Sequence, residues 1–215
     1  MKKSRIKNIA LVTALVGVLA VGSIFAFFTD TDTATNEFTV GNVSIDLTEP
    51  NWNPDNGKDL VPNQTVKKDP TITNDGVNDE YVFAKVTVPN AAVTAATKDG
   101  EVLPEANKDL FYYEVNSGWT LINTAEEEGQ TVYTYVWGTA DKPTALKKNA
   151  KTSAIFDSVT FINLVETGMD KYKGASTQIN IKAYGIQTTG FESANSTTIF
   201  NTLLEQVNSA SSGVK

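Results

Sequence analysis

EYVFAKVTV, residues 80–88, is the stretch that decides the fold class. Its apolar residues Val82, Ala84, Val86 and Val88 recur at every second position, which is the period of a β-strand and not the 3.6-residue period of a helix. Four small or β-branched side chains on one face predict a strand that packs one side against a core.

The same two-residue period recurs on both sides of this strand. Further strands are expected in the following segments: 43–47, 65–73 with an interruption at Pro70, 110–115, 119–122, 131–137, 154–161 and 178–187. Residues 89–107 are expected to form a connection rich in small residues, and the turn residues 116–118 predict a hairpin between their two flanking strands. Eight or so strands separated by turns predict an antiparallel β-sandwich.

Only the C-terminal part follows a helical period. The apolar residues recur there as Ile199, Phe200, Leu203, Leu204 and Val207. Because Asn195 and Ser196 precede them as candidate caps, we predict a short amphipathic helix over residues 196–208 and a tail over 209–215.

The first 26 residues have the pattern of a secretory signal. Four basic residues between positions 2 and 7 precede an uncharged run, 9–26, whose end predicts cleavage after Ala26 and leaves Phe27 as the first mature residue. The run of about 18 residues approaches the length of a bilayer span, about 20, so an uncleaved N-terminal anchor is the alternative. In both cases we expect the body of the protein outside the cytoplasm, with membrane contact only before cleavage.

The mature chain would be strongly acidic. The whole chain has 18 Lys and Arg against 25 Asp and Glu, and cleavage removes four basic residues and no acidic one, which leaves a formal net charge of −11. This charge argues against a nucleic-acid partner, because phosphate binding needs clustered Lys and Arg. It also predicts repulsion between copies that salt would screen.

The chain contains neither cysteine nor histidine. This composition removes thiol nucleophiles, Ser–His–Asp triads, the H-E-x-x-H motif and zinc sites built on imidazole or thiolate. An exported domain without disulfides must be held by its core or by its neighbours. We therefore expect no catalytic residues, no cofactor and no metal site.

Two kinds of local feature have a weaker claim to function. Asp30 and Asp32, and the loop 53–57, offer oxygen ligands of the type that calcium prefers, but a polar spacer and a turn are the favoured interpretations. Trp52 lies in a predicted loop and is the tryptophan best placed for surface contact, for example with a sugar. The other two tryptophans lie on predicted strands and are expected in the core.

Four stretches of the chain resemble, in order, the family that contains TasA and the camelysin (CalY) proteins. They are residues 26–47 with FFTDTDT and NEFTVGNVSIDL, residues 60–89, FDSVTF at 156–161, and INIKAYGIQTTGF at 179–191. The likeness fades between residues 90 and 151. The resemblance implies a jelly-roll form of the sandwich, export with the signal peptidase SipW, and a place in the biofilm matrix or at the cell surface. It also brings a metallopeptidase label.

The segment 27–40 is the part of the chain with the strongest indication of a function, which is assembly. Phe27, Phe28, Phe38 and Val40 flank small polar residues directly after the expected cleavage site, and such an extended segment can add a strand to a sheet edge. If it folds back on its own domain, it is simply the first strand. If it enters the next copy, cleavage frees a donor strand, and a head-to-tail contact that does not close gives a filament.

The sequence thus predicts four parts: a signal peptide at 1–26, a mature N-terminal strand or donor segment at 27–40, a β-sandwich at 41–191, and a C-terminal helix and tail at 192–215. The expected function is that of a secreted structural protein, not an enzyme, whose partners are further copies of itself and other matrix proteins. The alternatives are a camelysin-type surface metallopeptidase and a monomeric adhesin or carbohydrate-binding module.

Overall fold

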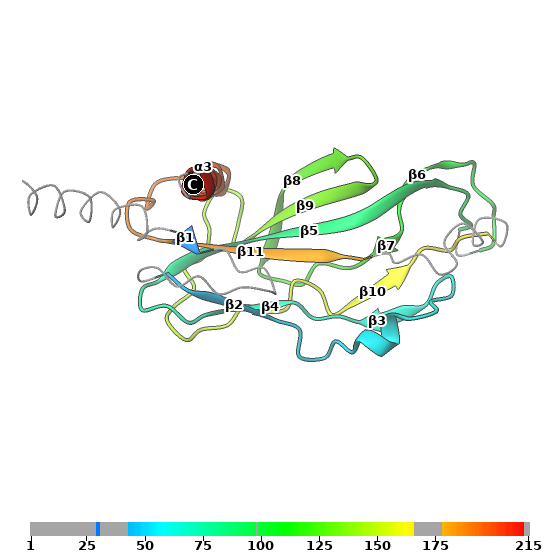
Figure 1. Ribbon diagram of the computed structural model, residues 1–215, viewed down its shortest axis with the longest axis horizontal. Coiled ribbons are helices and arrows are strands. Elements are labelled where there is room, and N and C mark those ends of the chain that lie inside the picture. Colours follow the sequence, from blue (N-terminus) through cyan, green and yellow to red (C-terminus); the bar gives the residue numbers. More distant parts are fainter. Residues whose placement is uncertain (1–28, 31–42, 98, 166–177, 213–215) are drawn as a thin grey trace, which may run out of the picture.

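In the part of the chain that the structure describes, two layers of antiparallel strands are covered on the outside by one α-helix (Figure 1). The computed structural model describes residues 29–30, 43–97, 99–165 and 178–212. The larger sheet lies above the smaller strands in this view, and the helix lies on the far side of the larger sheet.

The larger sheet has six strands among the described residues. Along the sheet they are β1 (Thr29–Asp30), β11 (Asn180–Gln187), β5 (Glu80–Val93), β9 (Gln130–Trp137) and β8 (Trp119–Glu127), while β6 (Ala106–Asp109) pairs with the far end of β5. All of these pairs are antiparallel. Strand β5 is therefore central, as the alternation in residues 80–88 requires.

The second layer consists of two smaller sheets. One contains β3 (Thr65–Lys67), β10 (Ser158–Phe161) and β7 (Phe111–Tyr112), and the other pairs β2 (Ile45–Thr48) with β4 (Thr71–Asn74). A 3-10 helix, η1 (Pro54–Gly57), lies in the loop between β2 and β3.

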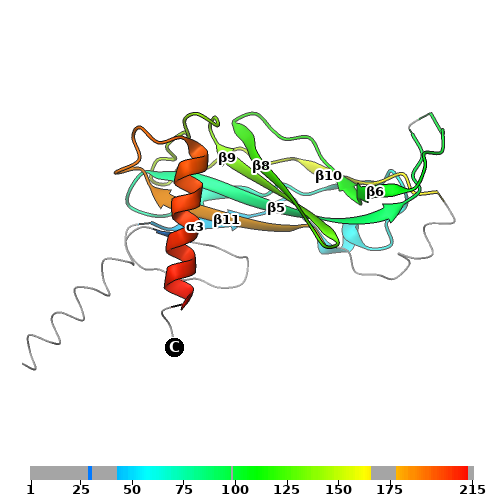
Figure 2. The ribbon, with the colours of Figure 1, turned by 90° about the horizontal axis from the view of Figure 1, so that it is seen from above.

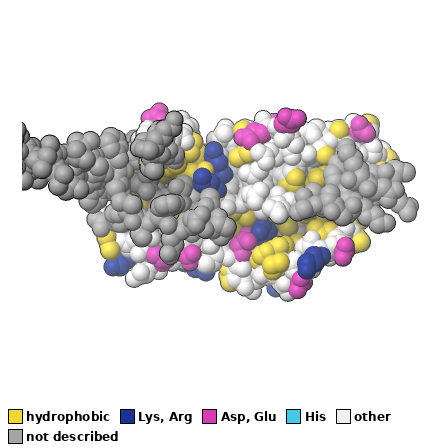
Figure 3. Space-filling view, viewed as in Figure 1, with side chains coloured by type: hydrophobic (Ala, Val, Ile, Leu, Met, Phe, Trp, Pro, Cys, Tyr) yellow, Lys and Arg dark blue, Asp and Glu magenta, His cyan; other side chains and the backbone are white. Residues whose placement is uncertain are grey.

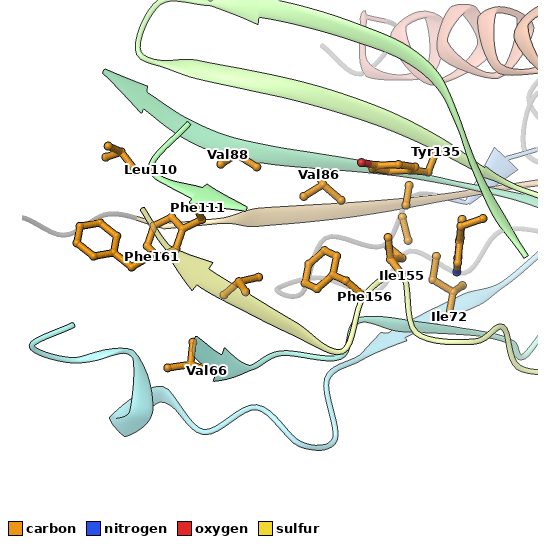
Figure 4. Close-up of a cluster of buried hydrophobic side chains, with 14 of the residues drawn as sticks. Val66, Ile72, Val86, Val88, Leu110, Phe111, Tyr135, Ile155, Phe156 and Phe161 are labelled. Atoms are coloured by element: carbon orange, nitrogen blue, oxygen red, sulfur yellow. The ribbon is translucent and has the colours of Figure 1, made fainter. Parts of the chain in front are cut away.

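The main core lies between the two layers (Figure 4). Val86 and Val88 of β5 point into it from the larger sheet, and Phe156 and Phe161 close it from the other side. The rings of Phe111 and Phe161 lie 5.4 Å apart at a tilted angle, which is a favourable arrangement for an aromatic pair.

A second apolar cluster lies on the outer face of the larger sheet, under helix α3 (Ser196–Ser212). Ile199, Phe200 and Leu203 of the helix are buried there against Phe83 and neighbouring residues of the sheet. Burial of each such side chain stabilises the fold by about 1.5–3 kcal/mol, so the helix is an integral part of the domain. Both faces of this end of the sheet are therefore covered.

The prediction of an antiparallel β-sandwich with a short C-terminal helix is confirmed, and the curled larger sheet fits a jelly-roll-like form. The helix continues to Ser212, four residues beyond the predicted end. Asn195 is its N-cap, because its side-chain oxygen accepts a hydrogen bond from the Thr198 backbone N–H at 2.9 Å.

The predicted hairpin across residues 116–118 is wrong. Strand β7 pairs with β10 in the smaller sheet, whereas β8 pairs with β9 in the larger one, so the turn carries the chain from one layer to the other. The expected connection at 89–107 is also partly strand, because β5 continues to Val93 and pairs there with β6. The hairpin of this region is β8–β9, which turns at Gly129 with a positive φ of 75°.

Candidate assembly site

Strand β1 lies on the outer edge of β11. Thr29 pairs with Ile186 and Asp30 with Gly185, in antiparallel register. Within the described residues β1 is the only strand on this side of β11, and the pairing covers two of the eight β11 residues. Residues 29 and 30 belong to the predicted donor segment, so part of that segment reaches a sheet edge of its own chain.

Helix α3 covers the outer face of the sheet beside this edge. The Phe200 ring lies 5.5 Å from the Tyr184 ring of β11, edge to face, and 5.1 Å from the Phe83 ring of β5. Helix α3 also contacts β1. Figure 2 shows that the helix crosses the sheet and that its C-terminal half extends past β11.

The inner side of the same edge is closed by a buried carboxylate. Glu80 is fully buried, and its Oε1 accepts a hydrogen bond from the Ser44 backbone N–H at 3.0 Å. A Cβ at position 185 would lie 2.9 Å from Glu80 Oε2 and 3.0 Å from Ile45 Cγ2, so only glycine fits there without displacement. The chain is thus fixed at residues 44–45, next to the point where β1 pairs.

The opposite edge of the sheet is built differently. Strand β8 has a register shift between Leu121 and Asn123, and acidic side chains gather over the β8–β9 turn that follows it (Figure 3). The acidic residues of this turn, Glu126 to Glu128, are all exposed. Bulges and like charges are two features by which proteins protect an edge strand against pairing. Of the two edges, β11 is the better candidate for adding a strand.

Trp52 is only half-buried, and its ring is partly covered. The Lys68 Nζ lies 4.7 Å from the ring centroid, and Gly57 lies so close that a Cβ there would be 2.8 Å from the ring. Lys68 also forms an ion pair with Glu49 at 2.7 Å. The tryptophan is therefore part of a clamped loop, and its role in surface contact stays a prediction.

A second cluster of titratable groups lies where β6 leaves β5. Asp109 accepts hydrogen bonds from the Thr131 hydroxyl at 2.6 Å and from the Tyr133 hydroxyl at 2.5 Å, and Thr131 accepts one from the Asn90 amide at 3.0 Å. Burial and the bond to Asp109 raise the pKa of Tyr133. The phenol stays protonated at neutral pH, so this network satisfies polar groups at a branch of the sheet.

No three Asp or Glu side chains gather as metal ligands in the part of the chain that the structure describes. The same residues contain no helix that is long and apolar enough to cross a bilayer. Residues 26–28, 38 and 40 lie outside the described residues. The cleavage site at Ala26 and Phe27, and the assembly role of Phe27, Phe28, Phe38 and Val40, therefore stay predictions.

The sequence indicates the special position of Gly185 in this site, but it does not indicate the role of Glu80. The isolated glycine in AYGIQ, at position 185, indicates a close approach of another group to the strand, but the approaching group comes from a distant part of the chain. Nothing in the local sequence of Glu80 indicates that its carboxylate is buried, because it begins an apolar strand next to polar turn residues.

The described residues form an antiparallel β-sandwich domain whose N-terminal strand lies at one edge of the larger sheet. The chain belongs to the camelysin metallo-endopeptidase family, whose model matches residues 2–192. This membership confirms the resemblance to the camelysin proteins, which are of the cell-surface or secreted kind. Comparisons with curated proteins and with solved structures find no match.

Proposed function

We propose that this chain is a secreted structural protein of the biofilm matrix or cell surface that assembles into fibres by exchange of its N-terminal strand. The observation that carries the proposal is the pairing of β1 with strand β11 at the edge of the larger sheet. Its main partner is a second copy of the same chain, with a signal peptidase acting during export and other matrix proteins as further partners.

Strand exchange between copies would keep the backbone pairing that β1 already makes with β11. The backbone groups of residues 29–30 find the same antiparallel partners whether β11 belongs to their own chain or to the next one. Cleavage after Ala26 would free Phe27 and Phe28 from the apolar run, and their burial in a neighbour would each contribute about 1.5–3 kcal/mol. Phe38 and Val40 are the other two side chains that the proposal places in the neighbour.

The exchanged contact is directional. The donor lies at the N-terminus and the acceptor is β11, so the two surfaces that meet belong to different parts of the chain. Such a heterologous contact generates a filament when the rotation between copies does not close. The protected edge at β8 leaves β11 as the edge for this contact.

The test uses engineered cysteines, since the chain contains none of its own. Two samples of residues 27–215 are mixed, one with Thr29→Cys and one with Ile186→Cys, and oxidised during assembly. Cross-strand neighbours lie about 4.5–5.5 Å apart at Cβ, close to disulfide geometry. Because Ile186 is fully buried, dimers linked by a disulfide between positions 29 and 186 are expected only if strands are exchanged between copies.

The control pairs Thr29→Cys with Thr124→Cys, an exposed position on the opposite edge strand β8. Dimers from the first mixture and not from the second, together with filaments in electron micrographs, support the proposal. If residues 27–215 stay monomeric and neither mixture forms dimers, assembly by exchange is wrong. Dimers from the control alone would move the acceptor to β8.

The two alternatives predict other outcomes. A peptidase would cleave casein in a metal-dependent way that survives purification, while residues 27–215 remain monomeric. A carbohydrate-binding module would bind glycans and lose that binding on Trp52→Ala with no change in oligomeric state. The chain has no histidine or cysteine to hold a zinc ion, so the structural role is the one we favour.

A further inference from the structure

The C-terminal half of helix α3 extends beyond the sheet that its first half covers. Ile199, Phe200 and Leu203 are buried against the sheet, whereas Leu204 and Val207, which follow on the same stripe, are only partly buried. In Figure 2 this second half passes β11 on the side where β1 pairs. The helix therefore lies over the edge as well as over the face of the sheet.

The first half of the helix is firmly anchored, which fixes the direction of the second half. The Ser196 hydroxyl donates a hydrogen bond to the Thr139 carbonyl at 2.6 Å, and the Ser196 N–H donates one to the Ala140 carbonyl at 3.0 Å. Asn195 caps the first turn. With Phe200 wedged between two aromatic rings of the sheet, the overhanging half is held by a rigid base.

We infer that the overhanging half of α3, residues 204–212, is part of the acceptor site and covers the N-terminal strand of the next copy when that strand pairs with β11. This inference rests on the proposed function. Helix α3 already contacts β1 in its own chain, so an exchanged strand in the same register would meet the same surface. The acceptor is then a corner with two walls, formed by the β11 backbone and the helix.

The sequence of the donor fits such a corner. Residues 29–33 read TDTDT, and alternate side chains of a strand point to opposite faces, so all three threonines of an incoming strand would share one face. Thr29 pairs with Ile186, whose side chain lies in the cluster under α3. In this register the threonine face of the incoming strand lies towards the helix, and the two aspartates lie on the other side.

A polar atom of the helix underside also suits this partner. The Oε1 of Gln206 is buried, and no described residue donates a hydrogen bond to it. A buried acceptor without a donor is unfavourable. Thr29 and Asp30 of the chain's own β1 do not supply this donor, so an incoming strand would have to supply it from a threonine further along, Thr31 or Thr33.

The first test locates the exchanged strand under the helix. Residues 27–215 with Thr29→Cys are mixed with the same chain carrying Val207→Cys, or with Asn208→Cys as the matched control, because Asn208 is the neighbouring exposed position. We expect at least about tenfold more disulfide-linked dimer with position 207 than with position 208. The mixture of Thr29→Cys and Ile186→Cys is run beside them.

The three mixtures separate the possible results. Dimers with positions 186 and 207, but not with 208, support the corner. Dimers with 186, and no preference for 207 over 208, overturn the role of the helix and leave strand exchange intact. The absence of dimers with 186 overturns the proposed function, and this inference with it.

The second test measures assembly. A carboxylate in the corner is unfavourable, so Val207→Asp should slow filament growth at least about tenfold, while Asn208→Asp adds the same charge and should leave the rate unchanged. Thermal unfolding of both monomers shows whether the domain is intact. If Val207→Asp alters the fold, Val207→Thr replaces it, since it keeps the shape. Equal growth rates for the variants at 207 and 208 would overturn the inference.

Discussion

The carboxylate of Glu80 occupies the space beside Gly185 that a larger side chain would need. A Cβ at position 185 would lie 2.9 Å from Glu80 Oε2, although 105 residues separate the two positions in the chain. The same carboxylate accepts the Ser44 N–H, so one buried group connects β5, β11 and the segment that leads into β2. This contact fixes the inner side of the edge where β1 pairs.

Gly185→Ala should therefore destabilise the domain by about 1–3 kcal/mol, because the added methyl group must displace Glu80 or Ile45 in a closely packed region. Urea unfolding followed by near-UV circular dichroism measures the change. Combining Gly185→Ala with Glu80→Asp should cost less than the sum of the two single changes, because the shorter acid leaves room for the methyl group. Strict additivity would contradict this explanation.

Asp109→Asn should destabilise the domain by about 2 kcal/mol, since the two hydroxyls bond to different carboxylate oxygens and the amide puts an NH₂ donor in place of one of them. The pKa of Tyr133 should fall towards its ordinary value and stay above it, because burial is the larger cause of its increase. Spectrophotometric titration of the tyrosines follows this pKa. Glu105→Gln, an exposed acid-to-amide change, is the control and should leave both quantities unchanged.

The stability of the domain should decrease in alkaline solution. Burial raises the pKa of Tyr184 to about 12, whereas an unfolded tyrosine titrates near 10. Below pH 10 the phenol is neutral in both states and its contribution is intact; between pH 10 and 12 only the unfolded state ionises, and about 2–3 kcal/mol is lost.

Tyr184→Phe should reduce this loss without abolishing it, because burial also raises the pKa of Tyr113 and Tyr135. Urea unfolding at several pH values between 8 and about 11 measures the slope. Tyr112→Phe is the matched control, since Tyr112 is 55% exposed. An equal slope in both variants would argue against the role of burial at Tyr184.

Lys68→Met should destabilise the domain by about 1–2 kcal/mol, because it leaves the Glu49 carboxylate without its cation and removes the charge over Trp52. The Lys68 side chain is 9% exposed, so solvent screens this pair poorly. Lys58→Met removes an ion pair with Asp55 whose lysine side chain is 70% exposed, and it should change the stability by less than about 0.5 kcal/mol. Thermal unfolding compares the two variants.

The strands could be predicted from the sequence where one face is buried. Residues 80–88, 131–137 and 178–187 became β5, β9 and β11, because period-two alternation directly reflects a half-buried strand. The helix could be predicted for a similar reason, since its apolar stripe has the spacing that packing on the sheet requires.

Strand partners could not be predicted in the same way. The residues at 116–118 form a turn, but a turn that closes a hairpin and one that crosses between layers use the same residue types. The pairing of β7 with β10 instead of β8 brings Phe111 against Phe161, which lies about 50 residues further along the chain. The contact between Glu80 and Gly185 could not be predicted either, because the two residues are also far apart in the sequence.

The register shift in β8 has a consequence for the architecture of an assembled fibre. If one edge of the sheet accepts a strand and the other does not, each copy has one donor strand and one acceptor edge. The resulting polymer then has two different ends. Such a polymer lengthens without branching. A small proportion of copies that lack residues 27–40 would still accept a strand but could not pass one on, so they would act as terminators and shorten the fibres in proportion to their number.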